Sequence, residues 1–313
     1  MPYEFNSLLA EDIVAYLALR ASLGYSTDLY ARQLHDIDDF CAKGFPEEET
    51  LTKAMVMKWI ELRETECAGT QHIRASVIRM FGRFQSSEGK DAYILADRIT
   101  PPITRYAPYI LTDIELAALF NAIDTMSHPS LSPELAYLLP VVFRMMYCCG
   151  LRPGEPLRLR RGDVNLDSGL LTVYDTKNHT NRLVVMSDDL TGLCRRYDAY
   201  AGAREHFFVR PSGEPLTTAW LNYRFKACLR QAGLGELPIR QYELRHRFAT
   251  AILMDWVDRG LDVLSLMPRL AQYMGHKKTE STFYYIHLLG ERLVHSAGID
   301  WEGFSDLYPK GLS

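Results

Sequence analysis

The stretch AQYMGHKKTESTFYYIH, residues 271–287, decides how the rest of the chain is interpreted. A Gly-His pair, Gly275-His276, ends a short apolar segment and is followed by a polar loop. Two adjacent tyrosines, Tyr284 and Tyr285, then lie on the helix that we expect to follow. Buried packing is the simplest interpretation of such a pair. A chemical role for one of the tyrosines depends on what the upstream sequence provides.

The composition is that of an ordinary globular protein with two domains. The chain has 313 residues, and 47% of them are hydrophobic. Its longest apolar stretch, residues 135–143, is too short to span a membrane, and the N-terminus MPYEFNSLLAED lacks the order of a secretion signal. The 6 cysteines show no metal-ligand spacing. We therefore expect no metal, no cofactor, no membrane partner and a cytoplasmic location.

Charge neither requires nor excludes a nucleic-acid partner. The net charge of −4 departs from the excess of Lys and Arg that is typical of nucleic-acid-binding proteins. Binding depends on where the charges lie, however, and cations concentrate in residues 144–182 and 224–247. The distribution therefore permits DNA as a partner.

Helical periodicity dominates the N-terminal part of the chain. Apolar residues recur there at three- and four-residue spacing. The pattern predicts helices over residues 7–22, 27–43, 51–66 and 70–86. The last of them carries arginines beside its apolar stripe, which form either a solvated face or contacts to a DNA backbone. Arg74 and Arg83 are therefore candidates for DNA contact.

A change in composition marks a domain boundary. The run DRITPPITRYAPYIL, residues 97–111, holds three prolines and no helical period, as expected of an extended linker. Thr112, with Glu115 three residues later, then forms a capping box that predicts the start of a helix. We expect a helical domain over residues 1–95, a linker over 96–111 and a second domain over 112–313.

The second domain is predicted to be mainly α-helical with one small antiparallel sheet. A buried helix over residues 132–149 ends at Gly150. LLTVYD and RLVVM then predict two strands joined by a polar turn, and FFV at residues 207–209 predicts a third. Further helices are expected over residues 217–232, 241–258, 269–274 and 279–289.

Two arginines lie where more than solvation is expected of them. Arg152 follows the end of the buried helix, and Glu155 lies three residues further on. The pair either orients the turn or holds the arginine towards an oxyanion. Arg245 borders the apolar face of its helix, with Tyr242 one turn earlier on the same side. A guanidinium suits phosphate oxygens, although half-buried structural arginines are common.

Three other basic residues are weaker candidates taken alone. Lys177 lies at the hairpin turn, where a lysine is either solvated or able to reach a ligand held by other elements. His276 is either a satisfied helix-end residue or a group that donates to a phosphate or carries a proton. Arg182, at the start of the RLVVM strand, is a further candidate for DNA contact.

The order of these residues resembles the tyrosine recombinase, or phage integrase, family. GLRPGE is similar to the family's first-arginine box, DTKNHTNR to its lysine hairpin, YELRHRFAT to its histidine-x-x-arginine box and MGH to its glycine-histidine box. The similarity covers about residues 106–290, and the N-terminal helices look like the core-binding (SAM-like) domain. The resemblance implies as catalytic residues Arg152, Lys177, Arg245 and His276, with Glu155 in support. It also selects Tyr285 as the nucleophile, nine residues after the histidine.

The sequence departs from the family pattern in two places. Tyr242 stands where the histidine-x-x-arginine box has its histidine. A phenol can donate a hydrogen bond to phosphate but is a poor base, because its reference pKa is about 10; we keep Tyr242 as a catalytic candidate on this basis. The segment LDVLSLMPRLAQYMG is longer than usual, and Pro268 is expected to mark a small insertion before the final helix.

The resemblance implies the DNA breaking-rejoining fold and a site-specific reaction on double-stranded DNA. Tyr285 would attack the scissile phosphate and form a 3′-phosphotyrosine, the arginines and His276 would stabilise the phosphate charge, and Lys177 would protonate the leaving 5′-oxygen. Other recombinase subunits would complete a tetramer on DNA. Residues 290–313 would dock on a neighbouring subunit or pack on their own domain. Integration, transposition or excision of a mobile element is the expected role, and dimer resolution stays open beside them.

Two other functions remain open at this point. The same chemistry serves type IB topoisomerases, which relax DNA as monomers without a specific site. A DNA-binding accessory protein with a weakened site is the other alternative, and Tyr242 is the feature that supports it.

Overall fold

The computed structural model describes residues 3–97, 108–126, 132–175, 180–276, 278 and 280–288. The chain divides into two compact units, Met1–Tyr106 and Ala107–Ser313. Each unit has its own hydrophobic core.

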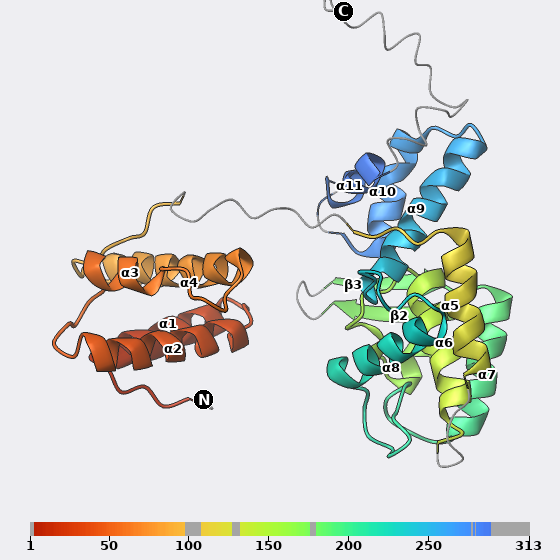
Figure 1. Cartoon of the computed structure of the whole chain (residues 1–313), viewed down its shortest axis with the longest axis horizontal. Helices are drawn as coiled ribbons and strands as arrows, with labels where there is room; N and C mark the ends of the chain where they lie inside the picture. Colours follow the sequence, from red (N-terminus) through yellow and green to blue (C-terminus); the bar gives the residue numbers. More distant parts are fainter. Residues whose placement is uncertain are drawn as a thin grey trace, which may run out of the picture. The chain divides into compact units, whose positions relative to one another are not determined.

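The N-terminal unit is a bundle of four helices (Figure 1). They are α1 (Ala10–Ser22), α2 (Asp28–Gly44), α3 (Lys53–Trp59) and α4 (Ala68–Ser87). Ile13, Leu34, Met55 and Phe81, one from each helix, are completely buried in the shared core. The four predicted helices are confirmed, although the third ends seven residues earlier than the pattern indicates.

Arg74 on α4 has a structural role at the end of α3. Its guanidinium donates to the carbonyls of Trp59 and Glu61 and pairs with the Glu66 carboxylate. These bonds satisfy carbonyl groups that the end of a helix leaves without partners. The predicted DNA contact of Arg74 is therefore wrong, because its side chain is only 3% exposed and its donors are engaged. Arg83 is 49% exposed, and its contact with DNA stays a prediction.

The second unit surrounds a small sheet with helices (Figure 1). Its core includes Leu119, Val142 and Phe225, which are completely buried. The helices are α5 (Asp113–Thr125), α6 (Leu135–Cys148), α7 (Asp188–Ala201), α8 (Thr218–Gln231), α9 (Tyr242–Asp258), α10 (Val263–Met274) and α11 (Glu280–Leu288), with short 3-10 turns at Pro156–Arg158 and Arg161–Asp163. The predicted capping box begins α5, where the Thr112 hydroxyl accepts from the Glu115 backbone N–H and the Glu115 carboxylate accepts from that of Thr112.

The sheet has three antiparallel strands in the order β1-β2-β3. They are β1 (Val164–Asn165), β2 (Leu170–Asp175) and β3 (Thr180–Val185). Leu171 pairs with Val184 across β2 and β3, and both side chains are completely buried. Leu183 and Val185, which alternate with the buried position, are 63% and 61% exposed. One face of the sheet therefore covers the core.

Three local predictions need correction. The third strand is β1 and not residues 207–209, which have only isolated bridges beside them, Arg160 with His206 and Val209 with Pro215. Helix α7 was not predicted, although Leu190, Cys194 and Tyr197 bury one of its faces. Residues 263–274 form one continuous helix with Pro268 inside it, so the expected start of this helix at residue 269 is wrong, while the insertion stays a prediction.

Gly150 connects α6 to the segment that carries Arg152, and its backbone has a φ of +58°. A Cβ at this position would lie 2.5 Å from a ring carbon of Phe248. We expect Gly150→Ala to lower the free energy of unfolding by about 2–4 kcal/mol, because left-handed strain and the ring clash add. Urea unfolding of the full chain measures the change.

Gly162→Ala is the matched control for this substitution. A Cβ there meets open space, so its effect should stay within about 0.5 kcal/mol. Equal losses of stability in both variants would contradict the assigned role of Gly150.

Candidate active site

Arg152 lies between two segments that are far apart in the sequence. Its guanidinium donates to the Glu155 carboxylate at 3.0 Å and to the Gly275 carbonyl. Its backbone N–H also donates to Glu155, at 2.8 Å. The side chain is 28% exposed, so a solvent-borne anion can reach this cation.

The buried Glu155 carboxylate is shared between two arginines. Arg182 on β3 donates two hydrogen bonds to it, at 2.9 and 2.7 Å, in addition to the bond from Arg152. Burial raises the pKa of the Glu155 carboxyl, but the hydrogen bonds and charge of Arg182 outweigh burial and leave the pKa below its ordinary value. Glu155 is therefore ionised at neutral pH and connects the sheet to Arg152.

The predicted DNA contact of Arg182 is wrong. Its side chain is 8% exposed, and its Nε–H donates to the Tyr273 carbonyl at 2.9 Å. Its Nη1 and Nη2 each donate one hydrogen bond to Glu155. Arg182 also lies under Gly275, where an added Cβ would approach its guanidinium within 2.9 Å. Arg182 therefore positions Glu155 and the loop that carries His276.

Arg245 on α9 is completely buried. It donates to the carbonyls of Gly150 at 2.5 Å and Met274 at 2.7 Å, and lies 2.9 Å from Nε2 of His276. Burial and the neighbouring Arg152 charge lower the pKa of Arg245 to about 10, which leaves it protonated at neutral pH. A phosphate can reach this cation only after neighbouring side chains move.

His276 has a defined tautomer in this arrangement. A guanidinium only donates, so Nε2 of His276 accepts from Arg245 and Nδ1 carries the proton. Nδ1 then donates to the Thr282 hydroxyl at 2.7 Å. Burial, followed by the charges of Arg245 and Arg152, lowers the pKa of His276 to about 3, so the ring is neutral at neutral pH.

Tyr285 on α11 faces this cluster. Its side chain is 2% exposed, and its hydroxyl lies 3.1 Å from Nδ1 of His246. Its ring is stacked with the His276 ring at a centroid distance of 6.3 Å. Burial raises the pKa of Tyr285 to about 12 against the opposing effect of Arg245, so the phenol stays protonated at neutral pH.

His246 is a site residue that the sequence interpretation missed. It follows Arg245 directly, and its ring packs on that of Tyr242 at a centroid distance of 4.9 Å. The spacing of four residues between Tyr242 and His246 puts both on one face of α9, and this signal was available in the sequence. Tyr242 thus packs on His246, and His246 in turn contacts the hydroxyl of Tyr285.

The structure brings most of the predicted residues together. Arg152, Glu155, Arg245, His276 and Tyr285 are linked by the contacts above, with Tyr242 beside them. Lys177 lies outside the described residues. Within the described part of the chain, no group of three or more His, Cys, Asp or Glu residues could hold a metal, and no helix is long and apolar enough to cross a membrane.

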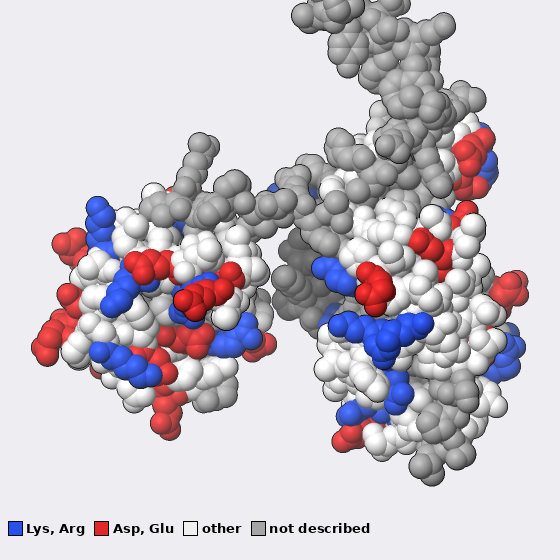
Figure 2. Space-filling view, in the orientation of Figure 1, with Lys and Arg blue, Asp and Glu red and all other residues white. Residues whose placement is uncertain are grey.

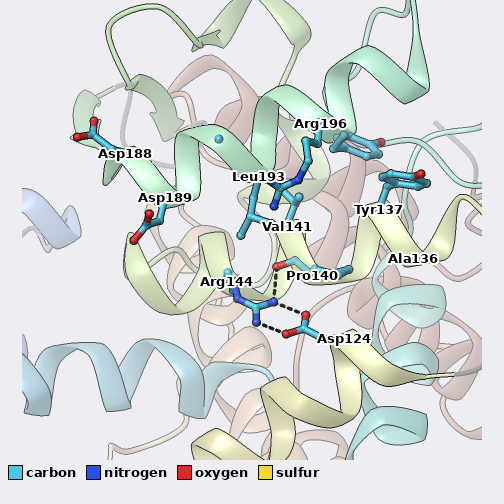
Figure 3. Close-up of a pocket in the computed structure, with 12 residues that line it drawn as sticks. Asp124, Ala136, Tyr137, Pro140, Val141, Arg144, Asp188, Asp189, Leu193 and Arg196 are labelled. Atoms are coloured by element: carbon cyan, nitrogen blue, oxygen red, sulfur yellow. Dashed lines mark hydrogen bonds and ion pairs between the residues drawn. The ribbon is translucent and has the colours of Figure 1, made fainter.

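Two surface features of the described residues can be considered separately, one on each unit. A pocket of about 570 Å³ between α5, α6 and α7 is lined by Tyr137, Arg196 and the ion pair of Arg144 with Asp124 (Figure 3). None of the predicted catalytic residues that the structure describes lines it.

On the N-terminal unit, acidic and basic side chains are intermixed in the view of Figure 2, so this face has no single sign of charge.

The chain matches known proteins over most of its length. Residues 110–292 match the model of the phage integrase family. The chain belongs to this family. As a tyrosine recombinase, the protein is an enzyme that cuts and rejoins DNA.

Two curated relatives match the recombinase over most of its length and most of their own. An integrase/recombinase of Sinorhizobium fredii, y4rE, is 30% identical over 295 residues, which cover 90% of this chain and 92% of the relative. The tyrosine recombinase XerD of Lacticaseibacillus casei is 27% identical over 303 residues, covering 91% and 96%.

Solved structures share the fold of the recombinase. XerH bound to palindromic difH substrate, in a post-cleavage complex, matches with a TM-score of 0.67 at 18% identity and covers 88% of this chain and 79% of its own. A lambda integrase dimer bound to a COC′ core site matches with a TM-score of 0.61 at 18% identity, covering 88% and 76%. The predicted fold class, helical with a small antiparallel sheet, is confirmed.

Glu155→Gln should destabilise the recombinase in a pH-dependent way. The substitution removes the charge shared by two arginines and should cost about 3 kcal/mol near neutral pH. Because the pKa of Glu155 is lowered in the folded state, its contribution is present above the ordinary value of 4.5 and is lost as the pH falls through the folded value. Urea unfolding should show a wild-type advantage that is constant from about pH 7 down to the ordinary value of 4.5 and shrinks as the pH falls further.

Glu214→Gln serves as the control, because Glu214 pairs with Arg210 at the surface and is 62% exposed. It should change stability by less than about 1 kcal/mol. A loss for Glu155→Gln that does not vary with pH would contradict the assigned charge pairing.

Proposed function

We propose that the recombinase cuts duplex DNA at a specific site by forming a 3′-phosphotyrosine through Tyr285. The observation that carries this proposal is the convergence of Arg152, Arg245 and His276 around the ring and hydroxyl of Tyr285. Three segments distant in the sequence supply these groups. A phenol surrounded by two guanidinium groups is suited to attack on a phosphodiester, since the cations favour the charge that develops on the phosphate.

Each residue has a distinct role in the proposed reaction. The partly exposed Arg152 receives the phosphate first. Once the site has opened, Arg245 donates to the non-bridging oxygens, and His276 donates through Nδ1–H in place of its bond to Thr282. Lys177 protonates the leaving 5′-oxygen as general acid. The covalent phosphotyrosine keeps the phosphoester, so rejoining needs no nucleotide. The reaction is metal-independent, because the two guanidinium groups supply the electrophilic role.

DNA and further recombinase subunits are the proposed partners. XerH and lambda integrase, which share the fold, are described as bound to DNA, and lambda integrase is described as a dimer. Residues 1–95 are proposed as the core-binding domain, joined by a linker at 96–111 to the catalytic domain at 112–313. Arg83 is proposed to contact the DNA backbone. The relatives are integrases and recombinases, so a topoisomerase or an accessory protein is not favoured.

Formation of a covalent adduct tests the nucleophile. The recombinase is incubated with nicked duplexes taken from the sequences that flank its gene, and SDS-stable protein–DNA adducts are quantified. Tyr285→Phe should abolish the adduct because the attacking oxygen is gone. Tyr284→Phe, the matched control, should keep it. An adduct that survives in Tyr285→Phe but vanishes in Tyr284→Phe would reverse the assignment.

Chelation tests the absence of a metal requirement. The yield and rate of adduct formation should change by less than about twofold when EDTA is added, because arginine donors supply the charge stabilisation. A loss of adduct in EDTA that returns on adding Mg²⁺ would show that the reaction needs a divalent cation.

A further inference from the structure

His246 contacts the hydroxyl of Tyr285 directly and, unlike the neighbouring Arg245, carries a nitrogen that can accept a proton. Its Nδ1 lies 3.1 Å from the phenolic oxygen, and the two rings are 5.5 Å apart with a tilt of 57°. His246 comes from α9 and Tyr285 from α11, and these two helices pack against each other. The packing of α11 on α9 therefore holds the imidazole at the atom that is proposed to attack.

The neighbouring groups are unsuited to take the proton of that hydroxyl. Both nitrogens of His276 are committed, since Nε2 accepts from Arg245 and Nδ1 donates to Thr282. The guanidinium groups of Arg152 and Arg245 only donate. Tyr242, at the position where the family has a histidine, is a phenol with a reference pKa of about 10 and is a poor base near neutral pH.

We infer that His246 is the catalytic base that accepts the Tyr285 proton during DNA cleavage. The inference rests on the proposed function and deepens it by naming the residue that activates the nucleophile. The step is balanced: the proton moves from the Tyr285 oxygen to Nδ1 of His246, the oxygen bonds to phosphorus, and the bond from phosphorus to the 5′-oxygen breaks. The leaving oxygen takes a different proton, from the general acid. On rejoining, His246 returns its proton to Tyr285.

The pKa values of His246 and Tyr285 make this proton transfer depend on bound DNA. Burial, then Arg245 and Arg240, lower the pKa of His246 to about 4, so its ring is neutral and able to accept. Arg245 lies on the same helix, Tyr242 packs on the ring from one turn away, and Tyr285 faces it from α11. The phenol pKa of about 12 makes proton transfer strongly unfavourable in the free protein. A phosphodiester anion beside Arg152 and Arg245 offsets their charge and raises the pKa of His246.

Substitution of His246 with a rescue measurement tests the inference. His246→Asn keeps a hydrogen-bonding group near the position of Nδ1, but this group cannot take a proton. The variant is assayed on the nicked duplex that forms the adduct with the wild type. It should slow single-turnover adduct formation about 10²- to 10³-fold with unchanged DNA affinity. His246→Ala should be equally slow and should be rescued by imidazole, with methylimidazoles of higher pKa rescuing better. His206→Asn changes a histidine whose backbone forms a β-bridge with Arg160 and which is not part of the described cluster, so this variant should react at the wild-type rate.

A duplex with a 5′-bridging sulfur in place of the scissile oxygen separates the two proton transfers. The sulfur leaves without protonation, so the defect of His246→Asn should persist on this substrate. If the defect disappears, His246 serves the leaving group and the inference is wrong. A wild-type rate for His246→Asn, or a slow His246→Ala that imidazole does not accelerate, would also overturn it.

The wild type separates failure of the inference from failure of the proposed function. If the wild type and His206→Asn form adducts and His246→Asn matches them, only the role of His246 falls. If the wild type forms no adduct on any duplex, the proposed function falls and the base assignment falls with it.

Discussion

The arrangement of the active site depends on the burial of one charged side chain, Arg245. A guanidinium removed from water must be given hydrogen-bond partners, and Arg245 finds them in the carbonyls of Gly150 and Met274. Gly150 lies 95 residues away in the sequence, and Met274 lies 29 residues away. The ends of α6 and α10 must therefore meet at α9. Arg152 and His276, each two residues beyond one of these carbonyls, are brought together as a consequence.

A second buried charge extends the same network to the sheet. Glu155 accepts from Arg152 and Arg182, and Arg182 reaches it from β3. A carboxylate between two arginines is satisfied only when the sheet, the turn after α6 and the loop after α10 are all in place. Arg182 thereby connects β3, the strand that follows the proposed general acid in the chain, to the arginine that is proposed to bind the phosphate.

Burial also sets the protonation states of the site. The same exclusion of water that lowers the pKa values of His246 and His276 raises that of Tyr285. The free recombinase consequently holds a neutral Tyr285 and neutral histidines among fixed cations. The negative charge of DNA has a large effect on such a site, because electrostatic interactions are stronger away from water. In the proposed mechanism, activation of Tyr285 is therefore coupled to binding of the substrate.

The sequence by itself determined the features that depend on neighbouring residues. Apolar spacing located ten of the helices, the Thr112–Glu115 box began α5, and the order of the short boxes indicated the family. Tertiary structure decided the rest. Arg74 and Arg182 carry the same charge as Arg83, and only their buried carboxylate and carbonyl partners show that they serve the fold. His246 contacts the hydroxyl of Tyr285 on α11, and the two residues are 39 positions apart in the chain. A side chain's role follows from its partners, and partners that are distant in the chain are set by packing and not by local sequence.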